Sequence, residues 1–114
     1  MKILAPLFAG LLLCLSTTVF AEEHLDQAIE HAKAAVSEGQ AGKASSLVTH
    51  AKAALDHSLA ASIVAKSIPK GHIDAASASL QEAIDHGNLS HAGPATKSAE
   101  EGLAHLNAAK AATK

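Results

Sequence analysis

Histidine is the residue type whose number and spacing in this chain could support chemistry. All eight histidines lie after residue 21, and the gap within each of four successive pairs is seven or fourteen residues. The pairs are His24 and His31, His50 and His57, His72 and His86, and His91 and His105. A heptad drifts only ~20° around a helix, so both members of a pair lie on one face. Imidazole is the commonest protein ligand for borderline transition metals, and the pattern therefore predicts metal binding.

Carboxylates could join these histidines within one helix. Side chains seven residues apart are ~10.5 Å apart along a helix axis and cannot share an ion, whereas side chains three or four residues apart are neighbours. Glu82 lies four residues before His86, and Glu101 lies four residues before His105. We therefore include Glu82 and Glu101 among the candidate metal ligands. The alternative for each glutamate is an ordinary solvated helix charge.

Histidines could also meet across a helical hairpin. A turn centred near residue 40 would bring two histidine pairs level with each other, and the internal repeat described below would add a third. The predicted pairs are His31 with His50, His24 with His57, and His86 with His105. Whether their side chains converge depends on helix rotation, so we expect several open, shallow sites and not one buried cage.

Other kinds of chemistry find little support in the composition. The only cysteine is Cys14, in the segment predicted below to be removed, and neither HExxH nor CxxC spacing occurs. Arginine is absent, the net charge is slightly negative, and the only aromatic residues are Phe8 and Phe20, so a nucleic-acid partner is not expected. No Ser–His–Asp arrangement stands out, and we do not expect an enzyme.

Residues 1–21 have the pattern of a secretory signal peptide. The first two residues give a positive start, residues 3–19 are an almost unbroken apolar run, and Val19 and Ala21 are small residues where a signal peptidase cleaves. The apolar run is too short and too interrupted for a membrane anchor. We therefore predict a periplasmic protein whose mature chain is residues 22–114, with no stable membrane association after cleavage.

An internal repeat organises the mature chain. Residues 25–31 (LDQAIEH) reappear as residues 80–86 (LQEAIDH), an offset of 55, and each copy contains two stretches with helical period. Breakers containing glycine or proline separate these stretches and place four helices near residues 23–38, 43–67, 72–86 and 94–112. Short connections force antiparallel neighbours. The sequence thus predicts an all-α protein, an up-down-up-down four-helix bundle built from a duplicated helical hairpin.

The apolar stripes of these helices are rich in alanine. Alanine accounts for 24 of the 93 mature residues, so little apolar area is buried and stability should be marginal. The predicted stripe of the second helix is Val48, Ala51, Leu55 and Leu59, and it ends at the neighbours Ser62 and Ile63. Both histidines of that helix should lie nearly opposite this stripe, and no histidine of the chain should point squarely inward. The heptad positions without histidine are Glu38, Lys43, Ser79 and Ser98, all polar and expected at the surface.

Four short segments of the chain resemble the small metal-binding protein family. They are residues 28–33 (AIEHAK), 47–52 (LVTHAK), 82–87 (EAIDHG) and 91–97 (HAGPATK), and the similarity extends over nearly all of residues 22–110. The resemblance implies a periplasmic, histidine-rich four-helix bundle that binds Cu(II) and other divalent ions, with all eight histidines as ligands. The family tends to have histidine at the four heptad positions that lack it here, which implies fewer sites in this chain.

These features predict an exported, monomeric protein that buffers or scavenges divalent transition-metal ions through surface histidines. Cu(II) is the expected ion because the stability order of divalent ions favours it, with Ni(II), Zn(II) or other divalent ions as weaker competitors. The alternative interpretation is a helical bundle of the cell envelope with an interaction or chaperone-like role, in which the histidines act as a pH switch. An amphipathic membrane-surface protein is less well supported, because its helices would need basic polar faces.

Overall fold

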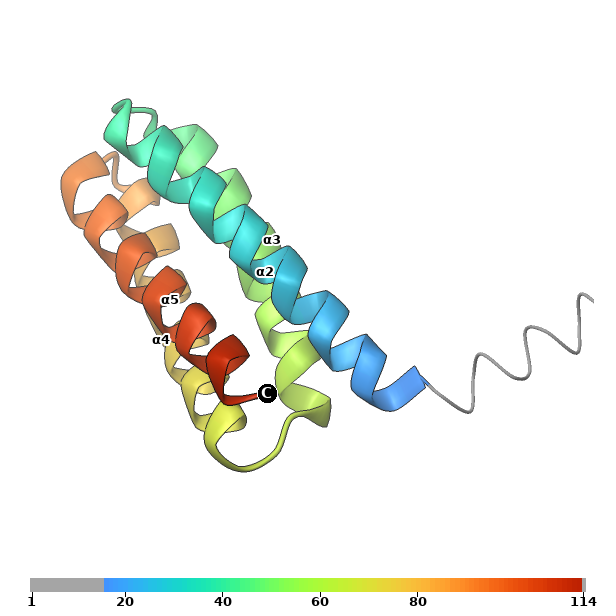
Figure 1. Ribbon diagram of the computed structural model, residues 1–114. Coiled ribbons are helices and arrows are strands. Elements are labelled where there is room, and N and C mark those ends of the chain that lie inside the picture. Colours follow the sequence, from blue (N-terminus) through green and yellow to red (C-terminus); the bar gives the residue numbers. More distant parts are fainter. Residues whose placement is uncertain (1–15, 114) are drawn as a thin grey trace, which may run out of the picture.

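Four helices and no strand make up the part of the chain that the computed structural model describes, residues 16–113. The helices are α2 (Ser16–Gln40), α3 (Ala44–Val64), α4 (Ser67–Asn88) and α5 (Ala92–Ala112). They run up and down in chain order (Figure 1), so the predicted all-α four-helix bundle is confirmed. Most of the predicted signal peptide lies outside the described residues.

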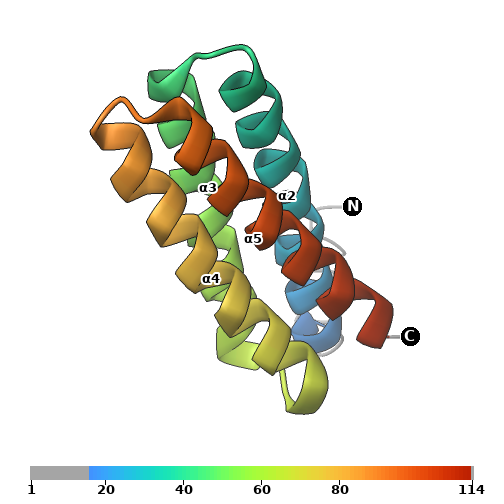
Figure 2. The same ribbon diagram turned by 90° about the vertical axis from the view of Figure 1, so that its left-hand side faces the viewer.

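The bundle consists of two helical hairpins packed side by side. One hairpin is α2 with α3 and the other is α4 with α5, and the two meet through α3 against α4 and α2 against α5. Figure 2 shows the second hairpin in front of the first. Both hairpin turns lie at one end of the bundle, and the α3–α4 connection lies at the other end with the end of α5 (Figure 1). An ion pair between Lys110 and Asp26 links the end of α5 to α2.

Two helix boundaries differ from the sequence prediction. The first helix begins at Ser16 and not near residue 23, so it continues through the predicted cleavage point. The third helix begins at Ser67 and not near residue 72, and it includes Pro69 in its first turn. The first N–H groups of a helix have no partner within the helix, so proline loses no hydrogen bond there. Pro69 therefore lies inside the helix start and does not separate two helices.

The two hairpin turns are built alike, 48 residues apart. Lys43 N–H donates to the Glu38 carbonyl at 2.9 Å in the first turn, and His91 N–H donates to the His86 carbonyl at 3.0 Å in the second. The left-handed residue of the first turn is Gly42, with φ of 78°, and the second turn has Ser90 at that place, with φ of 63°. The structural repeat is therefore one heptad shorter than the sequence repeat of 55.

The core is thin, as the alanine content predicts. The buried apolar side chains of the described residues comprise eleven alanines and eight larger residues. Gly87 shows how closely the helices approach, because a Cβ atom built there would lie 2.4 Å from Val48 Cγ2. None of the helices in this part of the chain has an apolar stretch long enough to cross a bilayer.

The predicted apolar stripe of α3 is wrong toward its C-terminal end. Leu59 is 50% exposed and Ser58 is buried in its place, and of the predicted neighbours Ser62 and Ile63 only Ser62 is buried, with Ile63 84% exposed. The Ser58 hydroxyl donates to the Ile73 carbonyl at 3.3 Å, and the Ser62 hydroxyl donates to Asp74. Small side chains with hydrogen-bond partners let α3 approach α4 closely, and this packing turns the larger aliphatic residues outward.

Candidate metal centre

The eight histidines lie along the two hairpins, on the flanks of the helix contacts. Seven of them are partly buried, and His91 is exposed. No histidine is buried, as predicted. His50 and His57, however, are not opposite the packed face of α3, because the buried face includes Ser58 in place of Leu59 and is rotated from the predicted stripe.

Four histidines of the first hairpin form one connected group. Nδ1 of His24 lies 2.9 Å from Nδ1 of His57, a hydrogen bond in which one neutral ring donates and the other accepts. His31 stacks on His57 with 5.8 Å between ring centroids and 6° between ring planes. His31 also lies 5.8 Å from His50, centroid to centroid. The predicted pairing of His24 with His57 and of His31 with His50 is therefore confirmed.

The second hairpin holds two separate histidine pairs. The ring centroids of His72 and His105 are 6.1 Å apart, and those of His86 and His91 are 6.4 Å apart. The predicted pairing of His86 with His105 is therefore wrong. The turn lies one heptad earlier than the sequence repeat places it. The partner of each histidine therefore lies fourteen residues earlier in the chain than the predicted partner. Because that shift is a whole number of heptads, histidine still meets histidine.

We call two heptad positions that face each other across a hairpin a level, and each hairpin has three such levels. Counted toward the turn, the first hairpin has His24 with His57, His31 with His50, and Glu38 with Lys43. The second hairpin has His72 with His105, Ser79 with Ser98, and His86 with His91. Each hairpin therefore lacks histidine at one level. This level is next to the turn in the first hairpin and in the middle of the second. Ser98 is buried, contrary to the prediction that all four of these polar residues lie at the surface.

The small metal-binding protein family matches residues 1–109 of the chain. No curated protein matches the sequence. The chain belongs to the small metal-binding protein family. Family membership supports the predicted metal binding, and it agrees with a structure in which the histidines gather in pairs between helices.

The spacing of one nitrogen pair in this small metal-binding protein suits a metal ion. At metal–nitrogen distances of about 2.0–2.1 Å, two nitrogens bound to one ion lie about 2.8–3.0 Å apart at a right angle and about 3.3–3.4 Å apart at the tetrahedral angle. The 2.9 Å between the Nδ1 atoms of His24 and His57 falls in the first range.

The surroundings of His57 in the first hairpin favour the neutral form of its ring. Burial lowers the pKa of His57 below its ordinary value, the neighbouring His24 and His31 lower this pKa further, and Asp56 opposes them. A histidine must be neutral to bind a metal ion. The surroundings of His57 therefore favour the protonation state that a ligand needs.

The candidate centres in the structure are pairs and not cages. Within residues 16–113, no three His, Cys, Asp or Glu side chains converge closely enough to enclose one ion. Glu82 and Glu101 are exposed, one helical turn before His86 and His105 respectively. They remain candidate ligands that could supply an oxygen to an ion held by the neighbouring pair.

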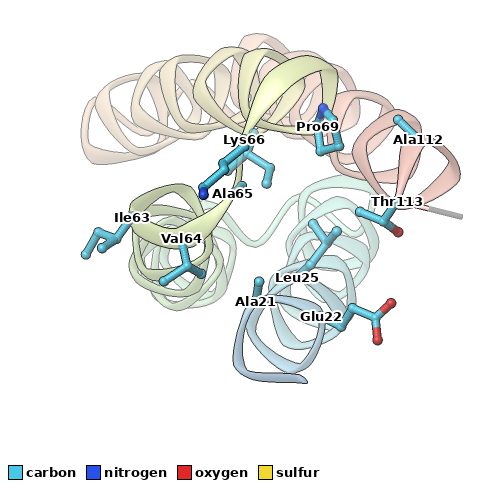
Figure 3. A pocket seen from close by; sticks show the side chains of 11 residues that line it. Ala21, Glu22, Leu25, Ile63, Val64, Ala65, Lys66, Pro69, Ala112 and Thr113 are labelled. Carbon is cyan, nitrogen blue, oxygen red and sulfur yellow. The ribbon is translucent and has the colours of Figure 1, made fainter. Parts of the chain in front are cut away.

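An open cavity of about 700 Å³ lies at the end of the bundle that holds the α3–α4 connection. Side chains from all four helices surround it (Figure 3), with aliphatic residues such as Leu25, Val64 and Ile73 among them. No histidine lines this cavity, and it offers few groups that could hold an ion.

Proposed function

We propose that this protein is exported to the periplasm and buffers divalent transition-metal ions there, chiefly Cu(II), with paired histidines as ligands. The observation that carries the proposal is that each of the eight histidine rings lies against another across a hairpin. The ring centroids of these cross-hairpin pairs are 5.1 to 6.4 Å apart. Rings at this separation can present two nitrogens to one ion after small side-chain rotations.

Open pairs suit buffering better than permanent storage. Two imidazoles leave coordination positions for water or for a carboxylate, so an ion can enter and leave without unfolding the bundle. The stability order of divalent ions makes Cu(II) the strongest binder at such positions and Ni(II) and Zn(II) weaker competitors. We propose that the protein acts as a monomer, because the pairs lie within single hairpins.

A Cu(II) titration of the mature chain by calorimetry tests this proposal. At pH ~7.5 we expect several ions to bind, and at pH ~5 we expect binding to be largely lost, because protons compete for the imidazole nitrogens. Replacing Lys52 and Lys97 with alanine provides a matched control that removes exposed charged side chains and no histidine. Absence of Cu(II) binding at pH ~7.5 by a folded chain would refute the proposal.

A second candidate function has one specific observation in its favour. His24, His31 and His57 lie so close together that charging them would push α2 and α3 apart. In an envelope protein with a chaperone-like role, acid would then expose apolar surface for a client. Circular dichroism without metal distinguishes the two functions, because this one requires the bundle to open between pH ~7.5 and ~5 and the metal buffer does not.

A further inference from the structure

The predicted cleavage after Ala21 leaves Glu22, Glu23 and His24 as the first three residues of the mature chain. A histidine at the third position from a free amino terminus can hold an ion with four nitrogens. These are the α-amine, the deprotonated amide nitrogens of the second and third residues, and the imidazole Nδ1. They close two five-membered rings and one six-membered ring in a plane. Square-planar nitrogen coordination is typical of Cu(II) and Ni(II).

We propose that removal of residues 1–21 creates a separate Cu(II) or Ni(II) site at the new amino terminus. Its ligands are the amino group of Glu22, the backbone nitrogens of Glu23 and His24, and the His24 imidazole. The inference rests on the proposed export and deepens the proposed metal binding. It differs from the paired-histidine sites because three of its four ligands are backbone nitrogens.

In the uncleaved chain these backbone nitrogens are engaged. Helix α2 runs without a break from Ser16 to Gln40. In an α-helix each N–H donates to the carbonyl four residues earlier, so the N–H groups of Glu23 and His24 donate to residues 19 and 20. Cleavage removes both acceptors, and the first N–H groups of the shortened helix have no partner within it. The same cut therefore creates the amine and frees the two amides.

The His24 side chain changes its surroundings in the same step. The ring of Phe20 packs edge-on against the His24 ring, with centroids 4.2 Å apart and an interplanar angle of 75°. Cleavage removes Phe20. The first two mature residues are exposed, and Leu25, which is only 2% exposed, fixes the helix to the core just after His24. The residues that must unwind around the ion thus contribute no buried apolar side chain.

The chelate needs the His24 nitrogen that now faces His57. When His24 Nδ1 binds the ion, its hydrogen bond of 2.9 Å to His57 Nδ1 is lost. His57 keeps its stacking contact with His31, which also lies beside His50. The amino-terminal site therefore takes one histidine and leaves the other three of the first hairpin available for a second ion.

This chemistry gives the site a selectivity that the pairs lack. The ion must displace two amide protons, which leave to solvent, and it must accept a square plane. Zn(II) has no preference for that geometry and usually binds as a tetrahedral ion. We therefore expect the amino-terminal site to hold Cu(II) or Ni(II) in the presence of excess Zn(II), whereas the histidine pairs exchange these ions freely.

The test compares the exported mature chain, confirmed by mass to begin at Glu22, with the same chain carrying one extra glycine before Glu22. The extension moves His24 to the fourth position and breaks the planar chelate, while every histidine pair stays intact. The first equivalent of Cu(II) should give the violet absorption of a square-planar four-nitrogen complex in the mature chain only. In the extended chain the first ion should bind to a histidine pair and should not give this absorption.

Two point variants make the assignment specific. His24→Ala should abolish the violet absorption, and His57→Ala should preserve it, because His57 belongs to the pair and not to the chelate. Equal violet absorption in the mature and extended chains would overturn this inference while leaving the metal buffer intact. An exported chain that begins elsewhere than Glu22 would also overturn it. Failure of both chains to bind Cu(II) would overturn the proposed function itself.

Discussion

His72 and His105 should bind one Cu(II) ion together, and a double-mutant cycle can detect this sharing. Their ring centroids are 6.1 Å apart across the second hairpin. His72→Ala or His105→Ala removes one nitrogen from the same chelate, so the second substitution should have much less effect than the first. We expect a coupling energy of about 1–3 kcal/mol in Cu(II) binding, the upper part of the range for residues in direct interaction.

The matched control is the cycle of His86→Ala and His105→Ala. His86 lies fourteen residues after His72, which places it about 21 Å farther along the axis at a rise of about 1.5 Å per residue. The effects of these two substitutions should add to within about 0.5 kcal/mol. Calorimetric titration at pH ~7.5 measures both cycles, with circular dichroism to show that each variant is folded. Coupling in the His86 cycle and none in the His72 cycle would refute the pairing.

Three further outcomes follow from the structure. Because the pKa of His57 is lowered on folding, its contribution to stability is present above the unfolded value of 6.5 and is lost as pH falls through the folded pKa. Thermal melts without metal at several pH values should show this loss of stability. The loss should be smaller in His57→Gln and unchanged in His91→Gln. Leu80→Ala should destabilise the bundle by about 2–5 kcal/mol in urea unfolding, because Leu80 is fully buried, while Leu59→Ala at the surface should change stability by less than about 0.5 kcal/mol. The double substitution Glu38→His and Lys43→His places histidines at the one level of the first hairpin that lacks them, and calorimetry should then count one more bound Cu(II) ion. The double substitution Glu38→Gln and Lys43→Gln should add none.

Helical period was enough to predict the bundle and that the two histidines of each helix share one face, but it misjudged how that face of α3 is turned relative to the core. The breakers placed the second turn between residues 86 and 94, where it lies, but the sequence repeat paired the histidines as if the turn came one heptad later, because a shift of one heptad leaves every residue on the same face. The segments 25–31 and 80–86 align at an offset of 55, but the turns repeat at 48. The decisive residue is Ser90, which takes the left-handed conformation that Gly42 takes in the first turn. A serine at that position gives no sequence signal comparable to glycine.

Hydrophobic patterning could not predict which face of α3 is buried, for a different reason. Leu59 and Ile63 are the larger apolar residues, yet Ser58 and Ser62 are the ones buried. The Ser58 hydroxyl lies 2.7 Å from the Ser77 hydroxyl of α4, so both groups keep hydrogen bonds when water is excluded. Where helices approach closely, small polar residues with partners replace large apolar ones, and the partners become known only from the tertiary structure.

The order of the levels sets how bound ions would influence one another. In the first hairpin the two histidine levels are one heptad apart, and in the second the serine level separates them by two heptads. Two divalent ions about 10.5 Å apart repel by about 1.6 kcal/mol in water before salt screening, and at about 21 Å by half as much. Because the Debye length is about 8 Å at physiological salt, the second repulsion nearly vanishes while part of the first remains. The first hairpin would therefore release its second ion more readily than its first, whereas the pairs of the second hairpin would fill independently.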